Sequence, residues 1–66
     1  MNDNTRARIE GGLDILRREA RYGKPRSWKR HNALMRRARD HILLCGGVWE
    51  DYADELSRNF AELMRL

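Results

Sequence analysis

Cysteine and histidine are scarce in this sequence. Cys45 is the one cysteine among 66 residues, so no disulfide can form within the chain. A metal site is not expected either, because a structural zinc site uses four ligands and the only soft ones here are Cys45, His31 and His41. Small folds that lack both kinds of link commonly rely on a partner subunit. We therefore expect no cofactor, and we expect a homodimer with two-fold symmetry.

Long apolar runs are also absent. The longest is Ile42–Cys45, far short of the roughly 20 residues that a membrane-spanning helix needs. Residues 1–5 are polar and precede no apolar segment typical of an export signal. Together with the unpaired cysteine, this predicts a cytoplasmic protein without a membrane partner. Twelve of the 14 cations are Arg, which favours a GC-rich bacterial or phage genome.

Proline and glycine are few, and no strand-like alternation of apolar and polar residues occurs. Apolar residues instead recur at helical spacing, which predicts an all-α fold. A first helix is expected over residues 5–22, with Asn4 or Thr5 as its N-terminal cap. Gly23 is expected to end this helix in a left-handed conformation. The apolar stripe of the helix consists of Thr5, Ile9, Leu13, Leu16 and Ala20.

Two further helices are expected, over residues 28–45 and 48–65, so that the chain forms one small antiparallel bundle. Ser27 is the predicted cap of the second helix, and Glu50 and Asp51 are suited to the first turn of the third. The apolar side of the second helix consists of His31, Leu34, Met35, Ala38, Ile42 and Cys45. The apolar side of the third consists of Trp49, Tyr52, Ala53, Leu56, Phe60, Leu63 and Met64.

Two glycine pairs leave the helix boundaries open. Gly11 and Gly12 lie inside the first helix, where they indicate either fraying or the close approach of another backbone. Gly46 and Gly47 indicate a break between the second and third helices. However, a seven-residue spacing continues across this break, so one long helix bent at the pair and folded as a two-helix hairpin is the alternative. The residues at that spacing are Trp28, Met35, Ile42, Trp49, Leu56 and Leu63.

Charge is divided unequally along the chain. Residues 1–40 hold twelve cations and five acids, a net charge of +7, whereas residues 41–66 hold two cations and five acids, a net charge of −3. Between Glu19 and Asp40 there are eight cations and no acid. Helical spacing gathers Lys29, Arg30, Arg36 and Arg37 on one face of the second helix, opposite its apolar side. Such a basic face attracts an anionic partner.

The predicted partner-binding set adds residues at the start of the same helix. It consists of Arg26, Trp28, Lys29, Arg30, Arg36 and Arg37. Trp and Arg are enriched at the energetic centres of protein interfaces. The alternative interpretation is an ordinary solvated helix face, with cations that can also pair with the acids of the C-terminal helix, in the same chain or across a dimer.

More apolar surface is present than a lone three-helix bundle needs. Ile15 and Tyr22 lie off the apolar stripe of the first helix, and Leu43 and Leu44 flank the basic face of the second. An exposed patch of this kind is typical of an interface. The predicted dimer interface consists of Ile15, Tyr22, Leu43, Leu44 and Trp49. For Trp49, packing in the core is the other interpretation, and its core spacing favours it.

No catalytic motif is present. His41 and Cys45 are four residues apart on one helix face, yet a nucleophilic pair also needs a cleft and an oxyanion site, which a chain this small does not offer. Neither glycine pair has the flanking pattern of a phosphate-binding loop. A helix-turn-helix over residues 35–63 fits poorly, because its recognition helix carries Asp51, Asp54 and Glu55, which phosphates repel.

These observations predict a protein that works by binding and not by catalysis, without a small-molecule substrate. The leading hypothesis is a small regulatory or inhibitory protein that docks on an acidic protein surface through its Arg-rich helix face. A nucleic-acid-binding protein that uses the same basic face is the first alternative, with Trp28 or Tyr22 stacking on a base. A structural component of a larger assembly is the second.

Overall fold

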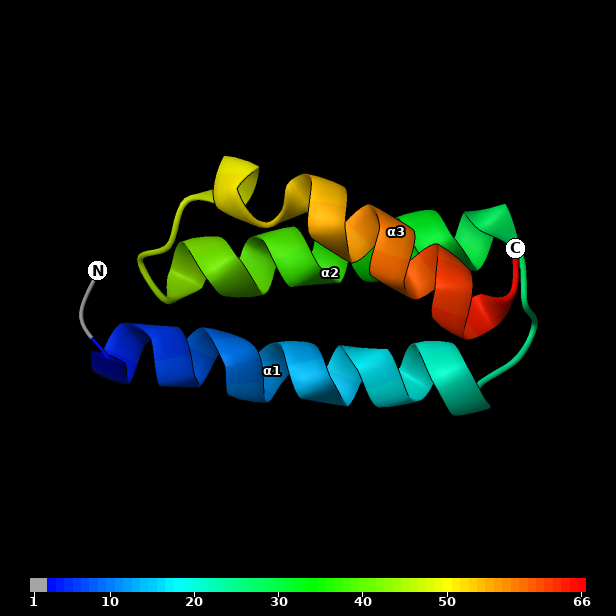
Figure 1. The fold of residues 1–66 in the computed structure, drawn as a ribbon, viewed down its shortest axis with the longest axis horizontal. Coiled ribbons are helices and arrows are strands. Elements are labelled where there is room, and N and C mark those ends of the chain that lie inside the picture. The colour runs from blue at the N-terminus through cyan, green and yellow to red at the C-terminus, as the bar shows by residue number, and fades with distance from the viewer. Residues whose placement is uncertain (1–2) are drawn as a thin grey trace.

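The computed structural model describes residues 3–66, which form three α-helices without a strand. These are α1 (Asp3–Tyr22), α2 (Trp28–Leu44) and α3 (Ala53–Met64), with a short 3-10 helix, η1 (Trp49–Asp51), before α3. The chain runs along α1, returns along α2 and turns again into α3, so that consecutive helices are antiparallel (Figure 1). Each helix packs against the other two. The predicted all-α bundle of three helices is confirmed, and the two-helix hairpin is wrong.

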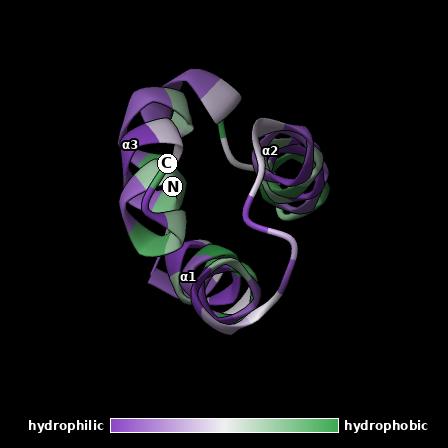
Figure 2. Ribbon diagram, turned by 90° about the vertical axis from the view of Figure 1, so that its right-hand side faces the viewer, coloured by the Kyte–Doolittle hydropathy of each residue, from purple (hydrophilic) through white to green (hydrophobic). Residues whose placement is uncertain are grey.

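The core lies between the three helices, which stand at the corners of a triangle when the bundle is seen from its end (Figure 2). Every buried apolar residue comes from one of the predicted apolar sides. These residues are Ile9, Leu13, Leu16, Ala20, Leu34, Ala38, Ile42, Leu56, Phe60 and Met64. Burial of these side chains removes their apolar surface from water, and this stabilises the bundle.

His31 is a buried polar residue at the α2–α3 contact. Its Nε2 donates a hydrogen bond to the backbone carbonyl of Ser57 (3.0 Å), and its Nδ1 lies 3.3 Å from Oδ1 of Asn32. The rings of Trp28 and Phe60 contact the imidazole edge-on. Burial of this ring is tolerated because its Nε2–H is satisfied by the Ser57 carbonyl.

The start of α2 follows the sequence prediction, whereas the start of α1 does not. The hydroxyl of Ser27 accepts a hydrogen bond from the backbone N–H of Arg30 (3.2 Å), so Ser27 caps α2 as predicted. The cap predicted at Asn4 or Thr5 is wrong, because α1 begins at Asp3 and both residues lie within its first turn. The residue that precedes Asp3 lies outside the described residues.

The Gly46–Gly47 pair ends α2 through a Schellman motif. Gly46 adopts a left-handed φ of 85°, and its N–H donates to the carbonyl of Leu43 (3.0 Å) while that of Gly47 donates to the carbonyl of Ile42 (2.8 Å). The chain therefore leaves the helix axis at Gly46. The residues at seven-residue spacing do not share one environment, since Trp28 is exposed and Ile42 is buried.

Gly12 and Gly23 leave room for side chains from α2. A Cβ on Gly12 would overlap the His41 ring, so the close approach predicted for this segment involves a side chain and not a backbone. A Cβ on Gly23 would overlap the guanidinium of Arg30. The left-handed conformation predicted for Gly23 is wrong, because Gly46 is the described glycine with positive φ. Arg30 instead donates to the carbonyls of Glu19 and Gly23, which satisfies the end of α1.

None of the helices within residues 3–66 combines the length and the apolar character needed to cross a bilayer.

Candidate binding surface

The outward face of α2 carries a line of mostly polar side chains that no other helix covers. Lys29, Asn32, Arg36, Arg39 and Leu43 follow one another at intervals of three and four residues, so they lie on one side of the helix. All five are exposed, and Trp28 stands beside them at the start of the helix. We call Trp28 and these five residues the α2 strip. They point outward because His31, Leu34, Ala38 and Ile42 direct the opposite side into the core.

Trp28 combines exposure with a fixed contact. Its residue surface is 58% exposed, yet its ring packs edge-on against the buried His31 ring, with centroids 5.0 Å apart and planes inclined by 70°. His31 is in turn held by its bond to the Ser57 carbonyl. A large aromatic side chain held in this way loses little conformational freedom when a partner covers it.

No ion pair in the described part of the chain neutralises the cations of the α2 strip. Within residues 3–66, ion pairs are formed by Arg17, with Glu10 and Asp14, and by Arg37, with Glu19. Lys29, Arg36 and Arg39 are in none of them. The strip therefore presents three positive charges without an ion-pair partner in residues 3–66, and these raise the electrostatic potential along α2.

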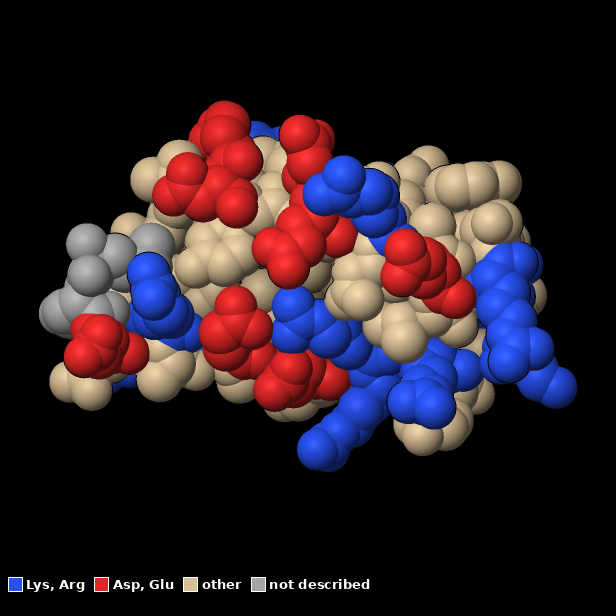
Figure 3. Space-filling model, viewed as in Figure 1, with Lys and Arg blue, Asp and Glu red and all other residues tan. Residues whose placement is uncertain are grey.

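The acids of the C-terminal part lie elsewhere on the molecule. Glu50, Asp51, Asp54 and Glu55 are exposed on η1 and the first turn of α3. On the face shown in Figure 3, acidic side chains gather over this region, and Lys and Arg side chains gather toward the opposite end. No ion pair joins α3 to α2 within the described residues. Pairing of these cations with the C-terminal helix of the same chain, which is one form of the alternative interpretation, is therefore wrong.

Three residues of the predicted partner-binding set instead act within the chain. Arg26 donates a hydrogen bond to the carbonyl of Arg21 (3.1 Å), and Arg30 donates to the carbonyl of Glu19. Arg37 forms an ion pair with Glu19. Its guanidinium lowers the pKa of Glu19 through a direct hydrogen bond, and the carboxylate raises the pKa of Arg37 in the same way. These three cations hold α2, and the segment 23–27 that precedes it, against α1.

Sequence reasoning missed Arg39 and Asn32 as members of the exposed line. The signal was present, because Arg39 lies three residues after Arg36 and seven after Asn32, which places all three on one helix face. Trp28, Lys29 and Arg36 are the members of the predicted set that the structure brings together on this surface.

The predicted dimer interface is divided among three places. Leu43 and Leu44 lie at the end of α2, and Leu44 is 87% exposed. Val48, which sequence reasoning missed, is also exposed and follows four residues later in the chain. Ile15 and Tyr22 lie on the outer face of α1, whereas Trp49 packs against the chain's own core. The core interpretation of Trp49 is therefore the one that the structure supports.

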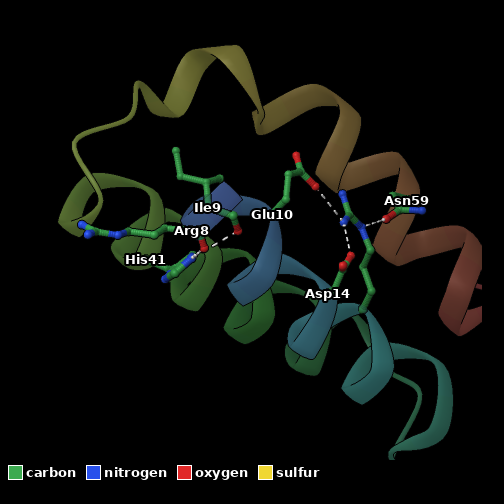
Figure 4. Close-up of polar contacts among 7 residues, drawn as sticks. Arg8, Ile9, Glu10, Asp14, His41 and Asn59 are labelled. Atoms are coloured by element: carbon green, nitrogen blue, oxygen red, sulfur yellow. Dashed lines mark hydrogen bonds and ion pairs between the residues drawn. The ribbon is translucent and has the colours of Figure 1, made fainter. Parts of the chain in front are cut away.

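His41 and Cys45 form a contact between helices and not a ligand cluster. Nε2 of His41 donates to the carbonyl of Arg8 (2.9 Å) and lies 3.2 Å from that of Ile9, as Figure 4 shows. Sγ of Cys45 is 3.8 Å from the same nitrogen. Among residues 3–66, no three His, Cys, Asp or Glu side chains are close enough together to hold a metal ion.

A second polar contact joins α1 to α3. The Arg17 guanidinium donates to Oδ1 of Asn59 (2.9 Å) while it also contacts Asp14 (2.8 Å) and Glu10 (3.3 Å). Figure 4 labels these three partners and marks the contacts with dashed lines. Arg17 is therefore a cross-helix tether whose charge is compensated, unlike the cations of the α2 strip.

No protein-family model, no curated protein and no solved structure matches this chain.

Proposed function

We propose that this protein is a small, non-enzymatic regulator or inhibitor that binds an acidic protein surface through the α2 strip. The observation that carries this proposal is the position of Trp28, which is 58% exposed, beside cations that have no ion-pair partner within residues 3–66. An exposed, fixed aromatic ring supplies buried contact area, and the neighbouring cations supply attraction and orientation. We expect it to act in the cytoplasm, where Cys45 would stay reduced.

A protein partner accounts for the composition of the surface better than a nucleic acid does. The strip changes along its length from Trp28 through three cations to Leu43, and exposed Asp40 lies next to it. Protein interfaces commonly combine aromatic, Arg and aliphatic groups in this way. A phosphate backbone along this surface would meet Asp40 and Leu43 at positions where further cations would be needed to bind it.

The test reverses two charges of the strip. Lys29→Glu combined with Arg36→Glu should abolish capture of the partner from a nuclease-treated extract of the native host, quantified by mass spectrometry. The matched control is Arg6→Glu with Arg58→Glu, since both residues are exposed, form no ion pair with any other residue of 3–66 and give the same change in net charge. Trp28→Ala should weaken capture as well. Equal capture by the strip variant and the control would rule out the α2 strip as the docking surface.

Nucleic-acid binding is the second candidate, favoured by the acid-free run of cations between Glu19 and Asp40. Phosphate contacts would make the affinity fall steeply between about 50 mM and about 200 mM salt. Fluorescence anisotropy with labelled single-stranded and double-stranded oligonucleotides measures this directly. Absence of binding at the lower salt concentration would exclude this candidate.

We also propose that the chain forms a homodimer through the apolar end of α2. Leu43, the last residue of the α2 strip, would then belong to the dimer interface, and Trp28 and the three cations would bind the partner. Leu43, Leu44 and Val48 are each at least half exposed, and the first two line a shallow depression together with Asp40. Covering these side chains would remove apolar surface from water. Analytical ultracentrifugation distinguishes three outcomes: a dimer supports this proposal, a folded monomer at micromolar concentration contradicts it, and large open-ended species favour a structural assembly protein.

A further inference from the structure

The C-terminal halves of α1 and α3 form a shallow groove. Two adjoining depressions, of about 400 and 430 Å³, share Arg21, Tyr22 and Leu63 as lining residues. Arg18 also lines the first, and Arg26 and Arg65 also line the second. We call these six residues the α1–α3 groove. In the view of Figure 2, α2 stands across the bundle from the line where α1 and α3 meet, so the groove is separate from the α2 strip.

Five guanidinium groups line the two depressions, and only that of Arg17 forms an ion pair within residues 3–66. The four groups without an ion pair there belong to Arg18, Arg21, Arg26 and Arg65. Arg26 is positioned by its hydrogen bond to the carbonyl of Arg21 (3.1 Å). Arg21 is positioned by the face of Tyr22, with its guanidinium carbon 5.5 Å from the ring centroid. Planar guanidinium groups bind carboxylates with two parallel hydrogen bonds, so the rim of the groove is suited to several anionic groups.

Leu63 and Tyr22 are the apolar side chains that line both depressions, and we call them the floor of the groove. Leu63 is partly buried and packs against the core, which fixes its position. Tyr22 is 73% exposed and lines both depressions. A ligand that lies here would cover an aromatic ring and an aliphatic side chain while it meets positive charge on both sides. A purely ionic ligand would leave the apolar floor uncovered.

We propose that the α1–α3 groove binds an acidic peptide segment in which a large apolar side chain stands between carboxylates. The apolar side chain covers Leu63 and Tyr22, and the carboxylates accept hydrogen bonds from Arg18, Arg21 and Arg65. Complementary charge and an apolar floor determine this choice of ligand. The depressions are open and shallow, which suits an extended segment lying along the surface.

The walls of the groove disfavour a nucleic acid. Carboxylates of Asp14 and Glu62 line the depressions together with the arginines. Asp14 is paired with Arg17, but Glu62 is in no ion pair within residues 3–66. A peptide can place an uncharged residue next to Glu62. A nucleic-acid backbone carries a phosphate at every nucleotide and cannot avoid the carboxylate in the same way.

Fluorescence anisotropy of a labelled peptide, Glu-Asp-Phe-Asp-Glu, on the full chain tests this proposal. Arg21→Glu with Arg65→Glu should weaken binding at least about tenfold, whereas Lys29→Glu with Arg36→Glu, which changes the net charge equally, should weaken it by less than about threefold. The milder pair Arg21→Gln with Arg65→Gln should also weaken binding, and circular dichroism verifies that each variant is folded. A peptide in which Ser replaces Phe should bind more weakly, because it leaves Leu63 and Tyr22 uncovered.

Several outcomes would overturn the proposal. Equal losses in the groove variant and the α2 variant would mean that net charge alone attracts the peptide. Equal affinities for the Phe and Ser peptides would show that an apolar contact with Leu63 and Tyr22 does not contribute to binding. Tighter binding of an oligonucleotide that competes with the peptide would identify a nucleic-acid site. The proposal stands apart from the function assigned to the α2 strip, because groove variants should keep capturing the partner of that strip.

Discussion

Gly11 and Gly12 are adjacent in α1 but face different surroundings. A Cβ on Gly11 would meet no atom within 4 Å, whereas a Cβ on Gly12 would overlap the imidazole of His41. Alanine is favoured over glycine inside a helix by about 1 kcal/mol. We therefore expect Gly11→Ala to raise the free energy of unfolding by about that amount. The free energy of unfolding of Gly12→Ala, measured by urea denaturation, should be about 1–3 kcal/mol lower than that of Gly11→Ala. The reason is that His41 must give up its hydrogen bond to the Arg8 carbonyl.

A double-mutant cycle locates the origin of that difference. If His41 causes the overlap, the destabilisation by Gly12→Ala should largely disappear in a His41→Ala background. An undiminished effect of Gly12→Ala in that background would contradict the assigned contact. Gly11→Ala should remain stabilising in both backgrounds, because its new methyl group points into open space.

The Glu19–Arg37 ion pair predicts a small dependence of stability on pH. The hydrogen bond from Arg37 lowers the pKa of Glu19 from its ordinary value of about 4.5. The pair therefore contributes its full stabilisation above that value, and the contribution is lost as the pH falls through the lowered pKa of the folded state. Both side chains are about half exposed, so the contribution should be less than about 1 kcal/mol.

Glu19→Gln isolates this contribution. At pH 7 the variant should unfold at a slightly lower urea concentration than the parent, and the difference should vanish at a pH below the lowered pKa of Glu19, where the parent carboxylate is also neutral. Raising the salt concentration at pH 7 should reduce the difference too. A difference that stays constant across this pH range would show that the ionised carboxylate is not its cause.

At the scale of elements, the break after α2 depends on one backbone conformation. Gly46 has a φ of 85°, and no atom lies within 4 Å of where its Cβ would be. The effect of a substitution there is therefore conformational and not steric. We expect Gly46→Ala to lower the free energy of unfolding by about 1 kcal/mol. Gly46→Asn should lower it less, because Asn adopts the left-handed conformation more readily. Chemical denaturation of both variants measures these changes.

The result of Gly46→Ala also tests the fold against its alternative. A continuous bent helix would place residue 46 in helical conformation, where alanine stabilises relative to glycine. An increase in stability would therefore support the two-helix hairpin and contradict the break at Gly46.

The helices could be predicted from the sequence because each one has a single apolar side. Ile9, Leu13 and Leu16 recur at helical spacing, and they are buried as expected. The seven-residue spacing through Trp28 and Trp49 suggested a continuous helix, but periodicity does not specify the path of the chain at Gly46. A left-handed residue ends a helix whatever the spacing on either side.

The candidate site could be predicted in part. Lys29 and Arg36 point outward because they lie opposite the buried residues of α2, and this follows from spacing alone. Arg30 and Arg37 lie nearer the α1 side, where they meet Glu19, which precedes them by 11 and 18 residues. The α1–α3 groove depends on the pairing of two helices that are not consecutive. Such partners are set by tertiary packing, which helical periodicity does not encode.

At the scale of the whole molecule, one chain closes its own core, yet it leaves an apolar end uncovered. If Leu43, Leu44 and Val48 pair two copies, the folded dimer is favoured by mass action. The melting temperature should then rise with protein concentration, and a hundredfold increase should add about 2.7 kcal/mol per dimer to the apparent stability.

Leu43→Ser combined with Leu44→Ser should remove this dependence of the melting temperature on concentration. Both side chains are exposed within the chain, so the variant should keep the stability that the parent shows at high dilution. A parent melting temperature that stays constant over the same hundredfold range would show that the bundle is stable without a second copy.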